Sequence, residues 1–318
     1  MNFRKVSLYL LCLTIGVLSC KKDDDPTIVA VEIRDRAVQQ LADMDSIHKY
    51  LDTHYYNSED FGSSNENPSL SDIEIFKLVD GASVPDGHTL LRTAVGNAKT
   101  ITYREVIYEF YVLKLNQGGG AASPTFADNV RVNYSGFTLE DAVFDETVNP
   151  VILDLTTLVP GWRKVLPDFN VAESFADNPD GTVNFLNKGL GIMFLPSGLA
   201  YFSSPSGIIT AYSPIIFKFE LLQMSENDHD GDGIPSYLED LNGDGEYTVN
   251  YEDLSDTSDD DSDGDGTPDY ADTDDDNDGI STINEDINND GDPRNDDSNG
   301  NGIPNYLDAT DTIRKVTT

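Results

Sequence analysis

The amino-acid sequence predicts an α+β protein that ends in a long acidic segment without regular structure. Apolar residues recur at spacings of three and four between Thr27 and Tyr56, which is the pattern of an amphipathic helix. Alternating apolar and polar residues from Tyr103 to Leu115 and from Val130 to Gly136 indicate strands. Beyond Glu226 the composition changes to Asp, Asn and Gly, so this part is predicted to be mostly irregular.

The net charge of −38 is concentrated near the carboxyl end of the chain. About half of the 58 acidic residues lie between Glu226 and Asp308, where Arg294 is the only Lys or Arg. This acidity argues against nucleic acid as a partner, because phosphates bind basic surfaces, and it favours cations. The two cysteines, Cys12 and Cys20, both lie near the amino terminus, so we predict no disulfide in the rest of the chain.

The first residues resemble the secretion signal of bacterial lipoproteins. Arg4 and Lys5 precede an apolar run too short to span a bilayer comfortably, and Val17-Leu18-Ser19-Cys20 is similar to a lipobox. The resemblance implies a signal peptide at residues 1–19, acylation of Cys20 and a lipidated linker at residues 20–26. The alternative is an ordinary signal peptide with an incidental cysteine.

The charged residues after Cys20 allow two interpretations. Lys21-Lys22-Asp23-Asp24-Asp25 is similar to the tag that sends some lipoproteins to the outer face of the outer membrane, and it also suits a solvated spacer. Several acyl chains give stable anchoring. We therefore expect a lipid anchor in the outer membrane of a Gram-negative bacterium, on its periplasmic or its cell-surface face.

Residues 27–102 are predicted to form an amino-terminal helical extension with loops. Ile33, Val38, Leu41, Ile47, Tyr50 and Leu51 give the apolar face of its helix. Asn57–Ser71 is a polar loop and Ile73–Val79 a strand. His48 and His54 are interpreted as ordinary surface residues, and Gly118-Gly119-Gly120 as a turn.

Short motifs follow one another with fixed order and spacing within residues 103–225. They are Val130-x-Val132-x-Tyr134-Ser135-Gly136, Phe144-Asp145, Asn149-Pro150, Val159-x-Gly161-Trp162, Leu195-Pro196, Leu199-Ala200-Tyr201, Gly207-Ile208-Ile209 and Ile216-Phe217-x-Phe219-Glu220-Leu221. Together they resemble the FKBP-type peptidyl-prolyl cis-trans isomerases. The resemblance implies a twisted antiparallel sheet wrapped around one short helix that starts near Leu158. It also implies that the extension serves dimerisation, so a homodimer is a possible partner state.

The same resemblance implies an isomerase site made of aromatic and apolar side chains. Trp162 would form the floor under a substrate proline ring, with walls from Tyr134, Phe144, Val159, Ile209 and Phe217. Tyr201 would donate a hydrogen bond to a substrate carbonyl, Asp145 would lie at the edge, and Val159 would also offer its backbone N–H. Few ionisable groups occur there, which suits a reaction that only twists an amide.

Several residues depart from the family pattern around this site. Val151 stands where a phenylalanine is usual, Phe202 replaces the glycine after Tyr201, and Thr210-Ala211 replaces a Pro-Pro pair. An insertion at about Val171 to Asn187 separates the helix from the following strand. We expect this insertion to influence substrate choice or to form a binding surface.

Residues 226–310 contain an acidic repeat with a period of about eleven to thirteen residues, followed by a tail at 311–318. Acids or amides recur at positions one, three, five and twelve, and glycine recurs at position six. The predicted metal ligands are Asp228, Asp230, Asp232 and Glu239; Asp261, Asp263, Asp265 and Asp272; Asp274, Asp276, Asp278 and Glu285; Asp286, Asn288, Asp290 and Asp297; and Asp297, Asn299, Asn301 and Asp308. The copy at Asp240, Asn242 and Asp244 lacks an acid at position twelve, although Glu252 is one residue further on.

This spacing is that of oxygen ligands around calcium. The loops abut one another and contain Pro235, Pro268 and Pro304, so the flanking helices of an EF-hand are not expected. The array resembles thrombospondin type-3 repeats, which implies structural calcium ions. The alternative is a permanently disordered acidic spacer.

Two functions from different classes follow from these observations. The first is an extracytoplasmic, lipid-anchored peptidyl-prolyl cis-trans isomerase, a folding catalyst or chaperone that acts on proline-containing polypeptides and needs no cofactor for the reaction. The second is a non-catalytic surface binding or adhesion lipoprotein with an FKBP-like cleft and calcium-stiffened repeats. A hydrolase is not expected, because His48, His54, His88 and His229 fit no triad or zinc motif.

Overall fold

The computed structural model describes residues 33–315, apart from 63–64, 66, 180 and 257. The predicted signal peptide, Cys20 and the lipidated linker lie outside the described residues. The chain divides into Met1–Arg34 and Asp35–Thr318, and the second unit contains the helices and strands described below. None of the helices in the described part combines the length and the apolar character that crossing a bilayer requires.

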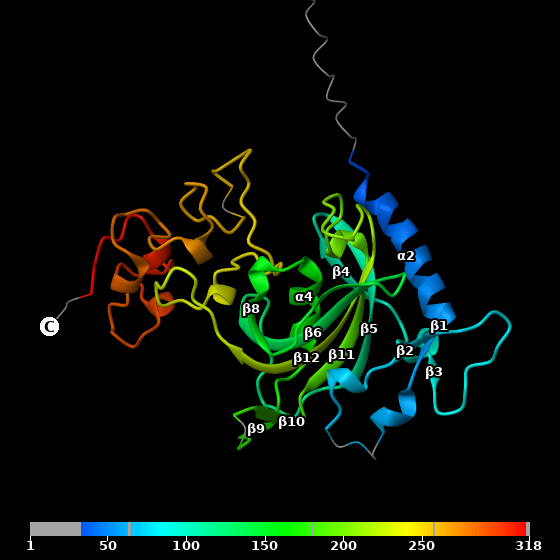
Figure 1. Ribbon diagram of the computed structural model, residues 1–318. Helices are drawn as coiled ribbons and strands as arrows, with labels where there is room; N and C mark the ends of the chain where they lie inside the picture. Colours follow the sequence, from blue (N-terminus) through cyan, green and yellow to red (C-terminus); the bar gives the residue numbers. More distant parts are fainter. Residues whose placement is uncertain (1–32, 63–64, 66, 180, 257, 316–318) are drawn as a thin grey trace, which may run out of the picture. The chain divides into compact units, whose positions relative to one another are not determined.

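A seven-stranded antiparallel sheet forms the centre of the second unit (Figure 1). Its strands are β4 (Lys99–Tyr103), β5 (Val106–Asn116), β6 (Asn129–Thr138), β7 (Val143–Glu146), β8 (Val151–Asp154), β11 (Gly189–Leu195) and β12 (Ile215–Ser225). They lie in the order β4-β5-β11-β12-β6-β7, and β8 pairs with β6. The predicted mixed class with an antiparallel sheet and few helices is confirmed.

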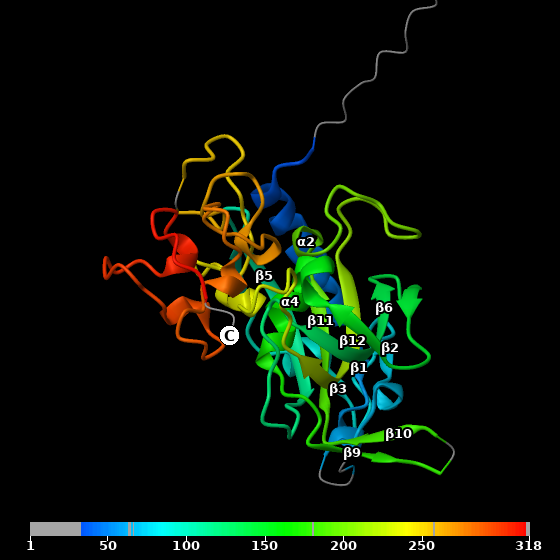
Figure 2. The same ribbon diagram turned by 90° about the vertical axis from the view of Figure 1, so that its left-hand side faces the viewer.

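Both faces of this sheet are covered, which explains the nearly continuous apolar run of β11. Met193 and Leu195 pack in one core with Trp162 from helix α4 (Pro160–Val165). The alternate residues Ile192 and Phe194 pack in a second core with Ile47 from helix α2 (Arg36–Thr53). Figure 1 shows α2 and α4 on opposite sides of the sheet, and Figure 2 views the sheet from the side of α4.

Among the described residues, the helix predicted for Thr27–Tyr56 is shorter than expected at both ends, because α2 begins only at Arg36 and Ile33 precedes it. α2 stops at Thr53, and His54–Tyr56 forms strand β1, which pairs with β2 (Ile75–Lys77) and β3 (Thr89–Leu90). A short helix, α3 (Leu91–Ala94), follows β3. Aromatic residues favour strands, and the three residues of β1 all carry a ring. We therefore interpret the end of the helix as a preference of these residues for the small sheet.

The strand predicted for Tyr103–Leu115 is a hairpin. Arg104 and Glu105 have φ values of 48° and 62°, so they form the two-residue turn between β4 and β5. The predicted boundary at residue 102 therefore cuts a hairpin, and β4 belongs to the main sheet. Apolar alternation continues through both strands, which is why the turn is not visible in the periodicity.

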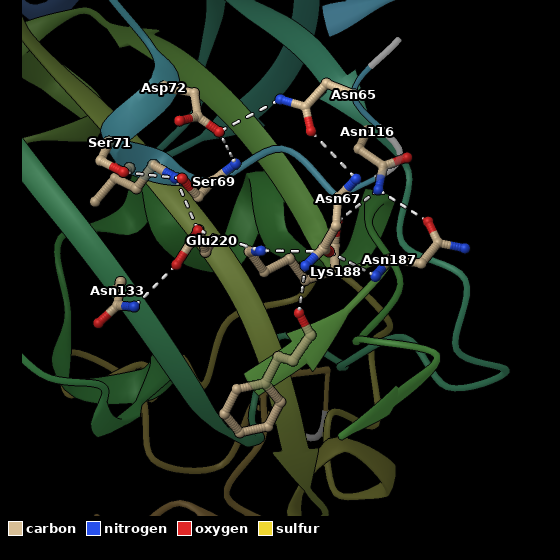
Figure 3. A network of polar contacts seen from close by, with 12 residues as sticks. Asn65, Asn67, Ser69, Ser71, Asp72, Asn116, Asn133, Asn187, Lys188 and Glu220 are labelled. Carbon is tan, nitrogen blue, oxygen red and sulfur yellow. Dashed lines mark hydrogen bonds and ion pairs between the residues drawn. The ribbon is translucent and has the colours of Figure 1, made fainter. Parts of the chain in front are cut away.

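A buried polar network fastens the predicted extension loop to the sheet (Figure 3). Glu220 on β12 accepts hydrogen bonds from the Leu70 backbone N–H at 2.7 Å and from Asn133 Nδ2 at 2.9 Å. Lys188 Nζ lies 3.7 Å from the same carboxylate, and both side chains are buried. Because each charge has partners, we interpret this network as structural.

The predicted insertion forms a separate two-stranded hairpin of β9 (Ser174–Asp177) and β10 (Val183–Leu186). Phe175 and Leu186 are 59% and 39% exposed on it. Its base contacts the extension loop, because Asn67 donates a hydrogen bond to the Phe185 carbonyl.

The acidic repeats form loops joined by single turns of 3-10 helix. These turns are Ser236–Leu238, Asp269–Ala271, Thr282–Asn284, Pro293–Asn295 and Asn305–Leu307. The backbone N–H of position two donates to the side chain of position nine in several copies, as in Ser262 to Asp269 and Ser298 to Asn305, both at 2.8 Å. The glycines at position six, among them Gly233 and Gly266, have positive φ values of 101° and 94°, so a side chain there would be strained.

Candidate isomerase site and acidic clusters

Four aromatic side chains meet at the predicted floor. The ring of Trp162 lies 5.0 Å from Phe217 and 5.5 Å from Tyr134, and Phe144 lies 5.5 Å from Phe217. Gly136 makes this packing possible, since a Cβ there would come within 2.6 Å of both phenylalanine rings. The rings come from α4, β6, β7 and β12, so the sheet and its helix together create the cluster.

The predicted site residues divide by exposure into a floor and a rim. Trp162, Ile209 and Phe217 are only 3%, 2% and 3% exposed. Tyr134, Phe144, Val159 and Tyr201 are half-buried against the same core, and Asp145 is exposed at the edge. A proline ring would therefore meet the rim first, and side chains of the rim must move for it to reach the indole.

The polar groups at this rim are arranged to donate hydrogen bonds and not to transfer protons. Tyr134 donates its hydroxyl to Asp145 at 2.7 Å, which fixes that carboxylate. Burial, and then the Asp145 charge, raise the pKa of the Tyr201 hydroxyl, so it stays protonated at neutral pH. Neither this hydroxyl nor the Val159 N–H makes a hydrogen bond to another described residue. Both are available to a ligand's carbonyl groups.

Two acidic clusters of the repeats contain carboxylate oxygens that are buried and unpaired. Asp230, Asp232, Glu239 and Asp275 place ligand atoms within 4.8 Å of one another. Glu239 is 1% exposed, and neither of its oxygens has a hydrogen-bond partner among the described residues. In the second cluster, Asp274, Asp276 and Asp278 converge, and both oxygens of the fully buried Glu285 are unpaired.

Unpaired buried carboxylates are costly because they lose hydration without compensation. A hard divalent cation with oxygen ligands supplies that compensation. The residues present therefore fit calcium at these two clusters. Asp261, Asp263 and Asp265 converge as a third group, with one buried unpaired oxygen on Asp263.

The remaining predicted ligands are arranged differently. Asp228 accepts hydrogen bonds from Gly231 and Gly233, and the oxygen of Asp272 accepts from the Asp274 backbone. In the last two copies the side chains bond to one another or to a lysine. Asp286 pairs with Lys315 at 2.7 Å, and Asp308 accepts from Asn299 and Asn301. These last two copies have amide side chains at position three or at positions three and five, and among the described residues they do not gather three acidic side chains.

Three further acids lie at these clusters although the repeat pattern does not select them. Asp275, from the copy that begins at Asp274, joins Glu239, and the buried Asp260 joins Asp240 and Asp244. Asp311 is 5% exposed with an unpaired oxygen, and its charge acts on Glu285. Asp311 lies one residue beyond the predicted end of the repeats at residue 310. Spacing within one repeat carries no signal for ligands supplied by another.

The repeats contact the isomerase-like part through α4. Glu246 forms ion pairs with Arg163 and with Lys164, the latter at 2.7 Å, and all three side chains are at most 14% exposed. Lys164 also donates to the Gly245 carbonyl at 2.8 Å. A cleft of about 840 Å³ borders this contact, lined on one side by Tyr103 and Arg104 and on the other by Tyr247 and Tyr270.

Replacing Glu246 by alanine is expected to loosen this contact. The change leaves two buried cations without their shared carboxylate, which costs about 2–4 kcal/mol for a mostly buried pair. Hydrogen exchange of the backbone around Gly245, together with urea unfolding, measures the effect. Glu252→Ala removes an exposed acid nearby and is the control. Equal exchange in the two variants would contradict the role of the ion pair.

A chain of hydrogen bonds in the repeats has the order of a catalytic triad. His229 Nδ1 lies 2.8 Å from Ser236 Oγ, and Nε2 lies 3.1 Å from Asp154 Oδ2. Ser236 is fully buried, however, and its hydroxyl also accepts from the His229 backbone. No substrate reaches such a hydroxyl, so this group is a structural link between the repeats and β8.

Known proteins are similar to two different parts of the chain. Over 117 residues it is 30% identical to the FKBP-type peptidyl-prolyl cis-trans isomerase FkpA of Aeromonas hydrophila, which covers 36% of this chain and 38% of that protein. Over 114 residues it is 29% identical to an FKBP-type 22 kDa peptidyl-prolyl cis-trans isomerase of Escherichia coli K12, covering 35% and 47%. The chain spans less than half the length of these two relatives.

A family model described as BamM C-terminal matches residues 229–292, within the acidic repeats. Among solved structures, a peptidyl-prolyl cis-trans isomerase from Pseudomonas syringae has a TM-score of 0.33 at 20% identity, covering 42% of this chain and 87% of that one. FkpA from Escherichia coli has a TM-score of 0.32 at 16% identity, covering 71% and 74%. About a third of the chain is thus similar in sequence to FKBP-type isomerases.

Proposed function

We propose that the chain is a peptidyl-prolyl cis-trans isomerase that acts on proline-containing polypeptides outside the cytoplasm. The observation that carries the proposal is the pair of free donors, the Tyr201 hydroxyl and the Val159 N–H, beside an aromatic floor formed by Trp162. The sequence similarity to FKBP-type isomerases supports the same function.

Rotation about an Xaa-Pro bond needs no acid, base or nucleophile. Its barrier is about 18–20 kcal/mol because the amide loses its resonance. The aromatic rings would hold the proline ring, while the Tyr201 hydroxyl and the Val159 N–H bind carbonyl groups on either side and favour the twisted amide. Asp145, fixed by Tyr134, would orient the rim and take no proton.

We also propose calcium as a structural cofactor of the acidic repeats. The unpaired oxygens of Glu239, Asp275 and Glu285 support it. Calcium would neutralise these buried carboxylates and so hold successive repeats together. We further propose, from the sequence alone, that Cys20 is acylated and anchors the chain in the outer membrane. A homodimer through the extension stays a prediction.

A second function is favoured by one observation. Trp162, Ile209 and Phe217 are nearly completely buried, which would suit a surface that binds polypeptides at the rim without catalysis. A lipid-anchored binding or adhesion protein is therefore the alternative, and the experiment below separates the two.

The full mature chain is expected to accelerate cis-trans exchange in a proline peptide. Tyr201→Phe should lower kcat/KM about tenfold, since a lost transition-state hydrogen bond of about 1.4 kcal/mol corresponds to that factor. Tyr251→Phe, at a side chain 73% exposed in the repeats, is the control. Exchange at the uncatalysed rate would refute the isomerase. Peptide binding without catalysis, detected by the fluorescence of Trp162, would establish the alternative.

A further inference from the structure

The first half of α2 buries polar side chains and exposes apolar ones. Gln39, Gln40 and Asp43 are 5%, 5% and 1% exposed, whereas Val38 and Leu41 are 66% and 70% exposed. This is the reverse of the face predicted from the periodicity. A buried polar face is unfavourable unless its groups are hydrogen-bonded, so the partners of these residues reveal what the helix holds.

Asp43 binds the start of the loop that carries Tyr201. Its Oδ2 accepts from the Ser197 backbone N–H at 2.7 Å and from the Ser197 hydroxyl at 2.6 Å. Its Oδ1 accepts from Gln39 Nε2 at 2.6 Å. Ser197 is fully buried at the first residue of a 3-10 turn that ends at Leu199, two residues before the rim residue Tyr201.

Arg36 holds the same loop from a position two turns before Asp43 in α2. Its guanidinium lies 4.0 Å from the ring centre of Phe202 and donates to the Gly198 carbonyl at 3.4 Å and the Tyr108 hydroxyl at 3.2 Å. Phe202 has a φ of 47° and is 7% exposed. A side chain in this left-handed conformation needs surrounding structure to hold it. The stacked guanidinium provides that support where the FKBP-type pattern has glycine.

The far end of the loop is tied to the same helix face. Gln39 Nε2 donates to the Tyr212 carbonyl at 3.5 Å, and the Tyr212 N–H donates to the Phe202 carbonyl at 2.6 Å. Arg36, Gln39 and Asp43 are spaced by three and four residues, so they form one ridge of α2. This ridge contacts residues near both ends of the segment 197–212, which carries Tyr201 and Ile209.

We propose that α2 is a positioning element of the isomerase site, in which Arg36 and Asp43 act through the segment 197–212. They fix the backbone on both sides of Tyr201, so that its hydroxyl and Ile209 stay directed toward the floor around Trp162. Neither residue touches substrate. The proposal rests on the proposed isomerase function, but the order of the loop can be measured without it.

Two measurements on the full chain test the proposal. The first is hydrogen exchange of the backbone amides in 197–212, and the second is kcat/KM for a proline peptide. Arg36→Ala and Asp43→Asn are expected to speed exchange in this segment at least tenfold and to lower kcat/KM about tenfold. Arg36→Lys keeps the charge but loses the planar stacking, so we expect an intermediate effect.

Two control variants separate positioning from stability. Ile47→Val weakens the buried half of α2 and should leave both the exchange of 197–212 and kcat/KM at the wild-type level in the folded protein. Lys49→Ala, on the exposed side of α2, should change nothing. If Arg36→Ala and Asp43→Asn shift only the unfolding midpoint, as Ile47→Val does, the proposal is overturned. If the wild type has no isomerase activity, the proposed function fails. Accelerated exchange in the two variants would still support the role of α2 in fixing the segment 197–212.

Discussion

Removing calcium from the full chain is expected to unfold the acidic repeats while the antiparallel sheet stays folded. Without a cation, the cluster of Asp230, Asp232, Glu239 and Asp275 must either hold like charges within 4.8 Å of one another or bind protons to neutralise them. Two such charges repel by roughly 4 kcal/mol at 4 Å and an effective dielectric constant near 20. The apolar anchors of the repeats are few, with Ile234, Ile280 and Tyr306 the buried ones. Packing there does not offset this repulsion.

Calcium at about a thousand times its dissociation constant adds roughly 4 kcal/mol of stability per site. Hydrogen exchange with calcium and with a chelator measures this difference separately for the repeats and for the sheet. Fast exchange in the repeats under both conditions would mean a disordered spacer. Slow exchange under both conditions would mean that the repeats need no cation.

Single substitutions locate the cation. Glu239→Gln and Asp275→Asn each remove one charged ligand from the first cluster, so each should weaken calcium binding there by about tenfold or more. Asp253→Asn removes an exposed acid outside the clusters and is the matched control. The Asp275 variant is the more discriminating, because the spacing of the first repeat does not include that residue. Calcium affinity in this variant equal to that of the control would refute the shared cluster.

The aromatic part of the site is predicted by the resemblance of its motifs to FKBP-type isomerases, and its residues meet in the structure because they lie on regular elements. Strand alternation fixes which side chains of β6 and β12 share a face, and Tyr134 and Phe217 therefore meet over Trp162. The position-six glycines are predictable from the repeat spacing, because the left-handed backbone conformation of the loops requires glycine there. The glycine signal is local to each repeat, so a single sequence is enough to find it, whereas the roles of the site residues come only from the family resemblance.

The remaining features depend on contacts between distant segments. The buried polar ridge of α2 is unfavourable for a helix alone and makes sense only when Ser197 and Phe202 lie against it. His54, expected on the surface, is 3% exposed because it stacks on Tyr50 at 3.8 Å. Asp275 reaches its cluster only after the repeats have folded. Periodicity reports the average environment of an element and misses such exceptions.

In the presence of a chelator, the acidic repeats are expected to be more stable at pH 5 than at pH 8. Burial, and then the neighbouring carboxylates, raise the pKa of Glu239 and of Asp275 to about 10 and that of Glu285 to about 8. Their pKa values in the unfolded chain are near 4. The folded repeats therefore bind more protons than the unfolded ones throughout this interval, and the free energy of unfolding falls as the pH rises through it.

Calcium should reverse the sign of this dependence. The cation binds the ionised carboxylates, so protons compete with it, and stability in calcium should increase from pH 5 to pH 8. Lys315 lowers the pKa of the Asp286 carboxyl, which is therefore ionised in both states above pH 5 and adds no slope in this interval. Urea unfolding of the repeats is monitored by hydrogen exchange at pH 5 and at pH 8. It gives the change of the unfolding free energy with pH in calcium and in the chelator. Glu239→Gln removes one titrating group and should flatten the slope in the chelator. Chelated repeats that gain stability between pH 5 and pH 8 would show that these carboxyls are ionised without a cation, and the calcium proposal would lose its physical basis.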